Sequence, residues 1–191
     1  MLTFRDILIK ETFEAEKNIC VEGDVKGLTE ITSLYVLGDM FVSGHIKDIQ
    51  NIYINGNLMV LKDIKNVKTL TVKGTLQVGG TMIMKGDLSV SDDLLVNGCL
   101  TSIGPVKVDK TLIVRGFVNL KSYLKVGNNL IANGLVHTQG HIDVGRDILV
   151  NGSLVSYDYI KTDGNAVVCK KLRAENALDI KGKITLIEDE T

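Results

Sequence analysis

Residues 70–96 read LTVKGTLQVGGTMIMKGDLSVSDDLLV, and this stretch decides the fold. A large aliphatic residue recurs every six positions, and Val or another apolar residue follows it two positions later. Gly or a turn-tolerant residue follows after two more positions. Stepping by six from Leu34 to Ile184 meets 26 apolar residues without a break, of which only Ala166 is small. Self-similarity at a fixed period is the signature of a repeat architecture.

Apolar and polar residues alternate within each hexad, which indicates a short strand with one buried face. Each hexad therefore supplies two inward residues and then a corner. The corner column starts at Gly38 and holds 14 glycines in its 25 positions to Gly182. Because Gly and Asn adopt left-handed backbone angles at low cost, we expect such angles at these corners.

Three hexads make one coil, since one inward column of the three differs from the other two. The two regular columns are nearly pure Val or Ile, whereas the third is mixed. Its members are Asp48, Asn66, Met84, Ser102, Leu120, Thr138, Ser156 and Ala174. We therefore predict an all-β protein: a single-stranded β-helix, or solenoid, with triangular 18-residue coils that are right-handed.

The phase of the repeat slips near the beginning of the chain. Gly23 precedes Gly38 by two and a half hexads instead of three, so we expect an irregular first coil from about Ile19. No loop interrupts the pattern between Leu34 and Ile184. We expect residues 1–18 to form either a short helix or a strand. Either element would cover the first coil, which is needed because an open rod end exposes apolar side chains. The predicted division is an N-terminal capping segment at 1–18, the β-helix at 19–187 and an acidic tail at 188–191.

Composition narrows the functional classes. The chain has 191 residues and a formal net charge of −1, which disfavours an electrostatic nucleic-acid binder. The cysteines Cys20, Cys99 and Cys169 lie far apart and suggest neither a disulfide framework nor a zinc site, so we expect a cytoplasmic protein. We expect no transmembrane segment, because no apolar run reaches about 18 residues. No motif points to an enzyme, a metal or a cofactor.

One outward column is apolar, although its side chains point away from the predicted core. A contiguous apolar patch along a rod usually marks an interface, so we expect a homo-oligomer or a protein partner along this stripe. The alternative is that the N-terminal segment folds back over part of it. The stripe consists of Phe41, Met59, Leu95, Ile113, Ile131, Leu149 and Val167, with Gln77 as its polar member.

Two further outward clusters have a structural and a functional interpretation. A polar column from Asp39 to Asn165 follows the corners; its side chains either bond the local backbone or form a ladder for cations. Tyr123, His141 and Tyr159 recur once per coil, with Asp143 on the same side. They are either ordinary cross-strand stacking or a patch that holds a small ligand or sugar.

The segments Leu70–Gly80 and Met84–Val90 carry V-x-G-x-L-x-V repeats and resemble the core of the bactofilins, polymer-forming bacterial cytoskeletal proteins. The resemblance lies in the repeat pattern and covers most of the chain. It implies a right-handed β-helix, end-to-end polymerisation and no nucleotide.

The left-handed hexapeptide acyltransferases also use 18-residue coils, but their repeat places small residues differently. Resemblance to that family would imply a coenzyme A-dependent enzyme, with His137 or His141 as base in a cleft between subunits. Left-handed coils and a trimer would favour it. The sequence favours a non-enzymatic structural or interaction protein that self-associates through the apolar stripe or through its ends.

Overall fold

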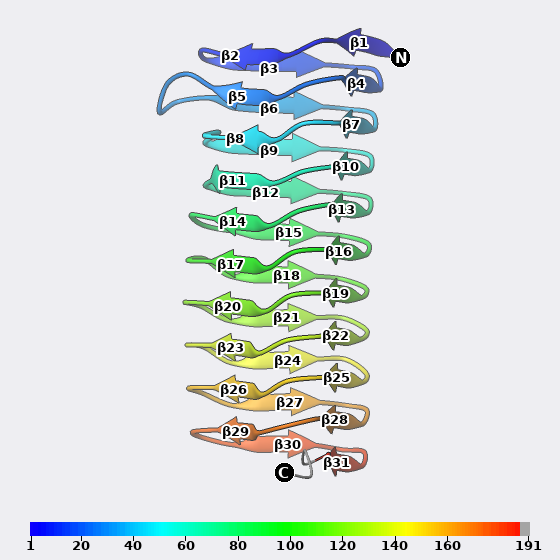
Figure 1. Ribbon diagram of the computed structural model, residues 1–191, viewed down its shortest axis with the longest axis vertical. Helices are drawn as coiled ribbons and strands as arrows, with labels where there is room; N and C mark the ends of the chain where they lie inside the picture. The colour runs from blue at the N-terminus through cyan, green and yellow to red at the C-terminus, as the bar shows by residue number, and fades with distance from the viewer. Residues whose placement is uncertain (188–191) are drawn as a thin grey trace.

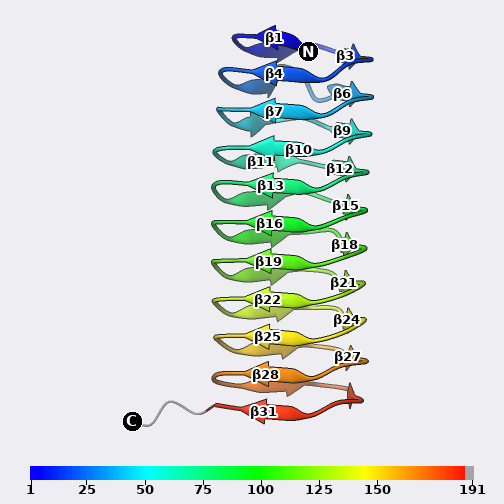
Figure 2. The ribbon, with the colours of Figure 1, turned by 90° about the vertical axis from the view of Figure 1, so that its right-hand side faces the viewer.

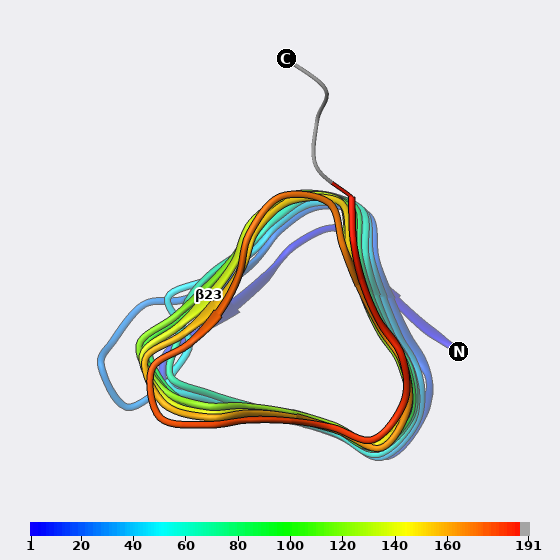
Figure 3. The ribbon, with the colours of Figure 1, turned by 90° about the horizontal axis from the view of Figure 1, so that it is seen from below.

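The computed structural model describes residues 1–187, and the acidic segment expected at 188–191 lies outside this range. The described residues form 31 β-strands and no helix, and each strand pairs in parallel with strands of neighbouring coils (Figures 1 and 2). Three sheets form the sides of a triangle (Figure 3). The predicted triangular β-helix is confirmed.

Each sheet takes every third strand along the chain. Sheet A contains β1 (Leu2–Phe4), β4 (Ile19–Val21), β7 (Met40–Val42), β10 (Leu58–Val60), β13 (Leu76–Val78), β16 (Leu94–Val96), β19 (Leu112–Val114), β22 (Leu130–Ala132), β25 (Ile148–Val150), β28 (Ala166–Val168) and β31 (Ile184–Leu186). Sheet B contains β2 (Ile7–Ile9), β5 (Val25–Gly27), β8 (Ile46–Lys47), β11 (Ile64–Val67), β14 (Met82–Met84), β17 (Leu100–Ser102), β20 (Val118–Leu120), β23 (Val136–Thr138), β26 (Leu154–Ser156) and β29 (Leu172–Ala174). Sheet C contains β3 (Thr12–Ala15), β6 (Ser33–Val36), β9 (Asn51–Ile54), β12 (Thr69–Val72), β15 (Leu88–Val90), β18 (Val106–Val108), β21 (Leu124–Val126), β24 (Ile142–Val144), β27 (Ile160–Thr162) and β30 (Leu178–Ile180).

The coils are right-handed. Viewed from the C-terminal end in Figure 3, the chain runs anticlockwise around the triangle as it approaches the viewer. This is the usual hand for a connection between parallel strands of one sheet.

The core follows the predicted phase. In most strands the first and third residues are buried and the middle residue points outward, as in Leu112-Ile113-Val114. Strands one coil apart align like residues, so Leu58 pairs with Leu76 and Val60 with Val78. The inward hydroxyl groups are satisfied: Ser102 and Ser156 each donate a hydrogen bond of 2.9 Å to a corner carbonyl. Burying these polar side chains therefore leaves no unpaired group.

Residues 1–18 form strands, which was one of the two expectations for this segment. Strands β1, β2 and β3 pair with β4, β5 and β6, so the segment is itself the first coil and covers the second. Phe4 and Phe13 pack edge to face, with ring centroids 5.5 Å apart, against the core at this end. The irregularity of the following coil is a loop at residues 28–32, which projects from the triangle in Figure 3.

Asp48 and Asn66 depart from the predicted inward column. Both have a φ of 58°, and both side chains are exposed. The next residues, Ile49 and Val67, are buried in their place, and the pairing of β11 with β14 shifts register after Lys65. A buried carboxylate without a partner would be costly, whereas Asp and Asn tolerate left-handed angles. The predicted inward position is therefore wrong for these two residues.

The expected left-handed glycine corners are also wrong, because no glycine has a positive φ. The requirement at the corners is space between stacked coils. A Cβ atom on Gly164 would lie 2.6 Å from Asp147 Oδ1 and 2.7 Å from the carbonyl carbon of Arg146. A Cβ atom on Gly98 would lie 2.7 Å from the carbonyl oxygen of Gly80. Glycine is thus selected by steric crowding at these positions.

The two ends of the described rod differ. Near the N-terminal end Ile7 and Ile9 are already buried. In the last coil Leu178, Ile184 and Leu186 are 45%, 43% and 50% exposed, although they continue the inward columns. Among residues 1–187, nothing covers this face of the core.

Candidate functional site

The predicted apolar stripe is a single ladder along the outer face of sheet A. Each member is the middle residue of its strand and pairs directly with the members one coil away, as Leu95 does with Ile113 and Ile113 with Ile131. Met59 and Leu149 are 37% and 38% exposed. The ladder is Phe41, Met59, Gln77, Leu95, Ile113, Ile131, Leu149 and Val167, and it continues to Cys20 at one end and Thr185 at the other.

The other two outer faces provide an internal comparison. The corresponding ladder of sheet B includes Lys26, Lys47, Lys65, Ile83, Thr101, Asn119, His137, Val155 and Arg173. That of sheet C includes Tyr35, Tyr53, Thr71, Ser89, Lys107, Lys125, Asp143, Lys161 and Asp179. Both are largely polar or charged. The apolar character is therefore particular to sheet A and is not a general property of this repeat.

The stripe is hollowed near one end. A surface hollow of about 350 Å³ is bordered by Met59 and Gln77, with Asn57 and Thr75 beside them. Leu149 lies on the same ladder toward the C-terminal end and remains 38% exposed. The face therefore has a recess beside Met59 and Gln77, and an exposed aliphatic side chain at Leu149.

The polar column beside the stripe bonds the backbone from coil to coil. The backbone N–H of Asn57 donates to Asp39 Oδ1 at 2.7 Å, and the N–H of Thr75 donates to Asn57 Oδ1 at 2.8 Å. The N–H of Asn165 likewise donates to Asp147 Oδ1 at 2.7 Å. These bonds agree with the structural interpretation of the column. Within residues 1–187, no group of three or more His, Cys, Asp or Glu side chains is placed to hold a metal ion.

Tyr123, His141 and Tyr159 come together as predicted. The imidazole is stacked between the two phenol rings, with centroids 4.8 Å and 4.7 Å apart and interplanar angles of 7° and 5°. Partial burial, together with Asp143 and Asp158, raises the pKa of Tyr159. Because the ring faces cover one another, the ring edges are left for solvent. This arrangement agrees with ordinary cross-strand stacking.

The three histidines occupy separate surroundings. His141 Nδ1 lies 4.0 Å from Asp158 Oδ2. His137 packs edge to face against Tyr157 with ring centroids 5.1 Å apart, and its Nδ1 lies 3.1 Å from Asn119 Oδ1. His45 belongs to a different cluster near the N-terminal end.

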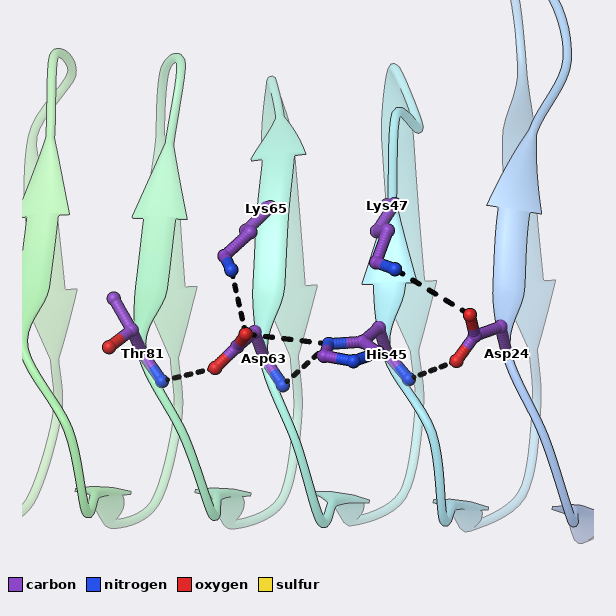
Figure 4. Close-up of polar contacts among 6 residues, drawn as sticks. All are labelled: Asp24, His45, Lys47, Asp63, Lys65 and Thr81. Atoms are coloured by element: carbon purple, nitrogen blue, oxygen red, sulfur yellow. Dashed lines mark hydrogen bonds and ion pairs between the residues drawn. The ribbon is translucent and has the colours of Figure 1, made fainter.

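That cluster links successive coils at the corner before sheet B (Figure 4). The N–H of His45 donates to Asp24 Oδ1 at 2.7 Å, and the N–H of Asp63 donates to His45 Nδ1 at 3.3 Å. Lys47 and Lys65 place their ammonium groups 3.6 Å from Asp24 Oδ2 and 2.7 Å from Asp63 Oδ2. The backbone bond from His45 lowers the pKa of Asp24. Partial burial would raise the pKa of Asp63, but the Lys65 contact and a backbone bond outweigh it and the net shift is downward.

Sequence reasoning missed a hollow under the loop at residues 28–32. Its volume is about 560 Å³, and Glu30 and Asp48 border it together with Lys68 and Lys85. Because acidic and basic groups share its rim, it has no single charge preference. Ile19 and Met40 occupy equivalent positions in successive coils, but the sequence between them is half a hexad longer than one regular coil. This extra length is the sequence signal that could have located the hollow.

Cys20, Cys99 and Cys169 are free thiols. The part of the chain that the structure describes contains no helix that could cross a membrane. Comparison of the chain with protein-family models, curated proteins and solved structures gives no match.

Proposed function

We propose that this chain is a stiff, non-enzymatic scaffold that self-associates through the outer face of sheet A or through its ends. The observation that carries the proposal is the apolar ladder from Phe41 to Val167, set between the polar outer faces of the other two sheets. An extended apolar face on a rod is stabilised when a second surface removes it from water. The exposed aliphatic side chains of the last coil make its end a second candidate surface.

The bactofilin-like interpretation is part of this proposal. Right-handed coils agree with it and disagree with the acyltransferase alternative, for which left-handed coils were the expectation (Figure 3). His137 and His141 are each occupied by an aromatic contact in the monomer, so the geometry gives no reason to assign either as a base. The free thiols suit a reducing compartment, and we propose a bacterial cytoplasmic location.

The proposal is tested by adding charge to one face at a time. Replacing Leu95, Ile113 and Ile131 together with Lys should dissociate the oligomer, because unpaired ammonium groups would have to be buried at the interface. The matched control replaces Thr101, Asn119 and Val155 with Lys, which adds the same charge to the outer face of sheet B. Light scattering gives the mass of each variant, and circular dichroism checks its fold. An oligomer that survives the sheet A variant excludes this face as the interface.

A further inference from the structure

We infer that the partner of the apolar stripe is a second copy of this chain, packed against it face to face. The two rods run antiparallel, and the two-fold axis lies parallel to the strands, between β16 and β19. This inference rests on the proposed function and specifies its partner and register. In this arrangement each column of sheet A faces the same column of the other copy in reverse order, as in an isologous interface.

The polar column selects the register. With the axis between β16 and β19, every carboxylate faces an amide or a hydroxyl group across the interface. The facing pairs are Asp39 with Asn165, Asn57 with Asp147, Thr75 with Asn129, and Asp93 with Thr111. The register in which all eleven strands overlap would instead place Asp39 against Asp147, and Asp93 against its own copy. Such contacts between like charges are costly at an interface, so a shift by one strand is favoured. A shift in the other direction, with the axis between β13 and β16, also separates the carboxylates, but it places Val167 against Thr3 and Leu149 against Cys20. The axis between β16 and β19 instead keeps all eight members of the ladder from Phe41 to Val167 facing one another.

The apolar ladder fits the same register. Leu95 faces Ile113, Phe41 faces Val167, and Met59 faces Leu149. Leu149 of the other copy would then lie against Met59, at the border of the hollow between Met59 and Gln77. In a parallel pair each residue would instead face the same residue of the other copy, so the two hollows would lie opposite each other. Interdigitation of side chains is what gives interface cores the packing density of protein interiors.

The size of the contact is sufficient for a specific dimer. The register overlaps ten of the eleven strands of sheet A, from β4 to β31. At about 4.8 Å per strand and about 3.3 Å per residue over a width of five residues, the footprint is about 790 Å² per copy. Specific interfaces commonly bury about 800 Å² per partner.

Cysteine cross-linking tests the register directly. In a background with Cys20, Cys99 and Cys169 replaced by Ser, the double variant Met59→Cys, Leu149→Cys should form a covalent dimer under mild oxidation. Strands β10 and β25 of one chain are five steps apart in sheet A, about 24 Å, so a disulfide within the chain is impossible. Met59→Cys alone should give no dimer, whereas mixing it with Leu149→Cys should give a mixed dimer.

A charge test provides a second readout. Asn57→Asp should weaken the dimer about tenfold or more, because the new carboxylate faces Asp147 of the second copy. Asn129→Asp is the control: it also adds a carboxylate next to an aspartate of its own column, but it faces Thr75 and should leave the affinity nearly unchanged. Asn57→Asp also removes a bond of 3.1 Å from Asn57 Nδ2 to Asp39 Oδ1 within the chain, so the stability of each monomer is measured beside its affinity. Thermal unfolding of both variants checks the fold.

The outcomes separate the register from the proposed function. A mixed dimer linking positions 59 and 149 supports the antiparallel register. A dimer mass with no such link, or a link between two copies of position 59, overturns the register while lateral association stands. A monomer at every concentration overturns both.

Discussion

Asn66 donates a hydrogen bond from Nδ2 to Asp48 Oδ1 at 2.9 Å, and both residues have a φ of 58°. The two residues share one irregularity in adjacent coils, which turns a polar side chain outward and brings Ile49 or Val67 into the core. Left-handed backbone is inexpensive for Asn and Asp and costly for branched residues.

Asn66→Val should therefore lower the free energy of unfolding by about 1–2 kcal/mol, because a β-branched side chain is strained at this φ. Asn66→Gly loses the same hydrogen bond without that strain and should cost less. Urea unfolding of the two variants measures the difference. Equal losses would show that the backbone angle does not decide the identity of this residue.

The alternation of Leu112 and Ile113 predicts opposite responses at neighbouring positions. Leu112 is fully buried, so Leu112→Ala should lower the free energy of unfolding by about 2–5 kcal/mol. Ile113 points outward, so Ile113→Ala should cost the isolated chain much less and should weaken self-association instead. Chemical denaturation at low protein concentration distinguishes the two. A larger stability loss at position 113 would contradict the assignment of inner and outer faces.

Corner glycines should resist even the smallest side chain. Gly98→Ala would place a Cβ atom 2.7 Å from a backbone oxygen, so the coils must separate locally and the melting temperature should fall. Lys62 occupies the same corner of the triangle two coils earlier with its side chain exposed, and Lys62→Ala should be nearly neutral. Similar melting temperatures for both variants would refute the steric explanation.

Asp24 should make stability depend on pH. Its pKa is lowered from 3.8 in the folded chain, chiefly by the backbone hydrogen bond from His45. A lowered folded-state pKa contributes stability above the ordinary value, and that contribution disappears as the pH falls through the folded-state pKa. Asp24→Asn should thus be less stable than the unmodified chain at neutral pH, with the difference shrinking as the pH falls below 3.8 and through the lowered folded-state pKa. A difference that stays constant across this range would exclude the carboxylate as its source.

Because His141 is stacked between two tyrosine rings, we expect the fold to tolerate another aromatic residue at this position. His141→Phe keeps a flat ring between Tyr123 and Tyr159, whereas His141→Ala removes two ring contacts and should cost about 1–3 kcal/mol. Thermal unfolding compares the two variants. If phenylalanine were as destabilising as alanine, the stacking would not be what holds this position.

The sequence predicted the coil, the phase of the core and the membership of the stripe, because a strict period transmits one strand's orientation to all the others. This reasoning fails for Asp48 and Asn66, because one residue with left-handed backbone angles shifts the inward phase by one position. The regular phase resumes in the next strand. The glycine corners were correctly located but wrongly explained, because the crowding comes from the preceding coil. The hollow under residues 28–32 depends on an insertion of half a hexad whose path no periodic pattern specifies.

Self-association through sheet A is tested most directly by light scattering of the unmodified chain over a dilution series, beside the Leu95, Ile113 and Ile131→Lys variant. We expect a mass of twice the 20.8 kDa chain for the unmodified protein and of one chain for the variant, with both proteins folded. A monomer at every concentration, or a mass unaffected by the three lysines, would contradict it.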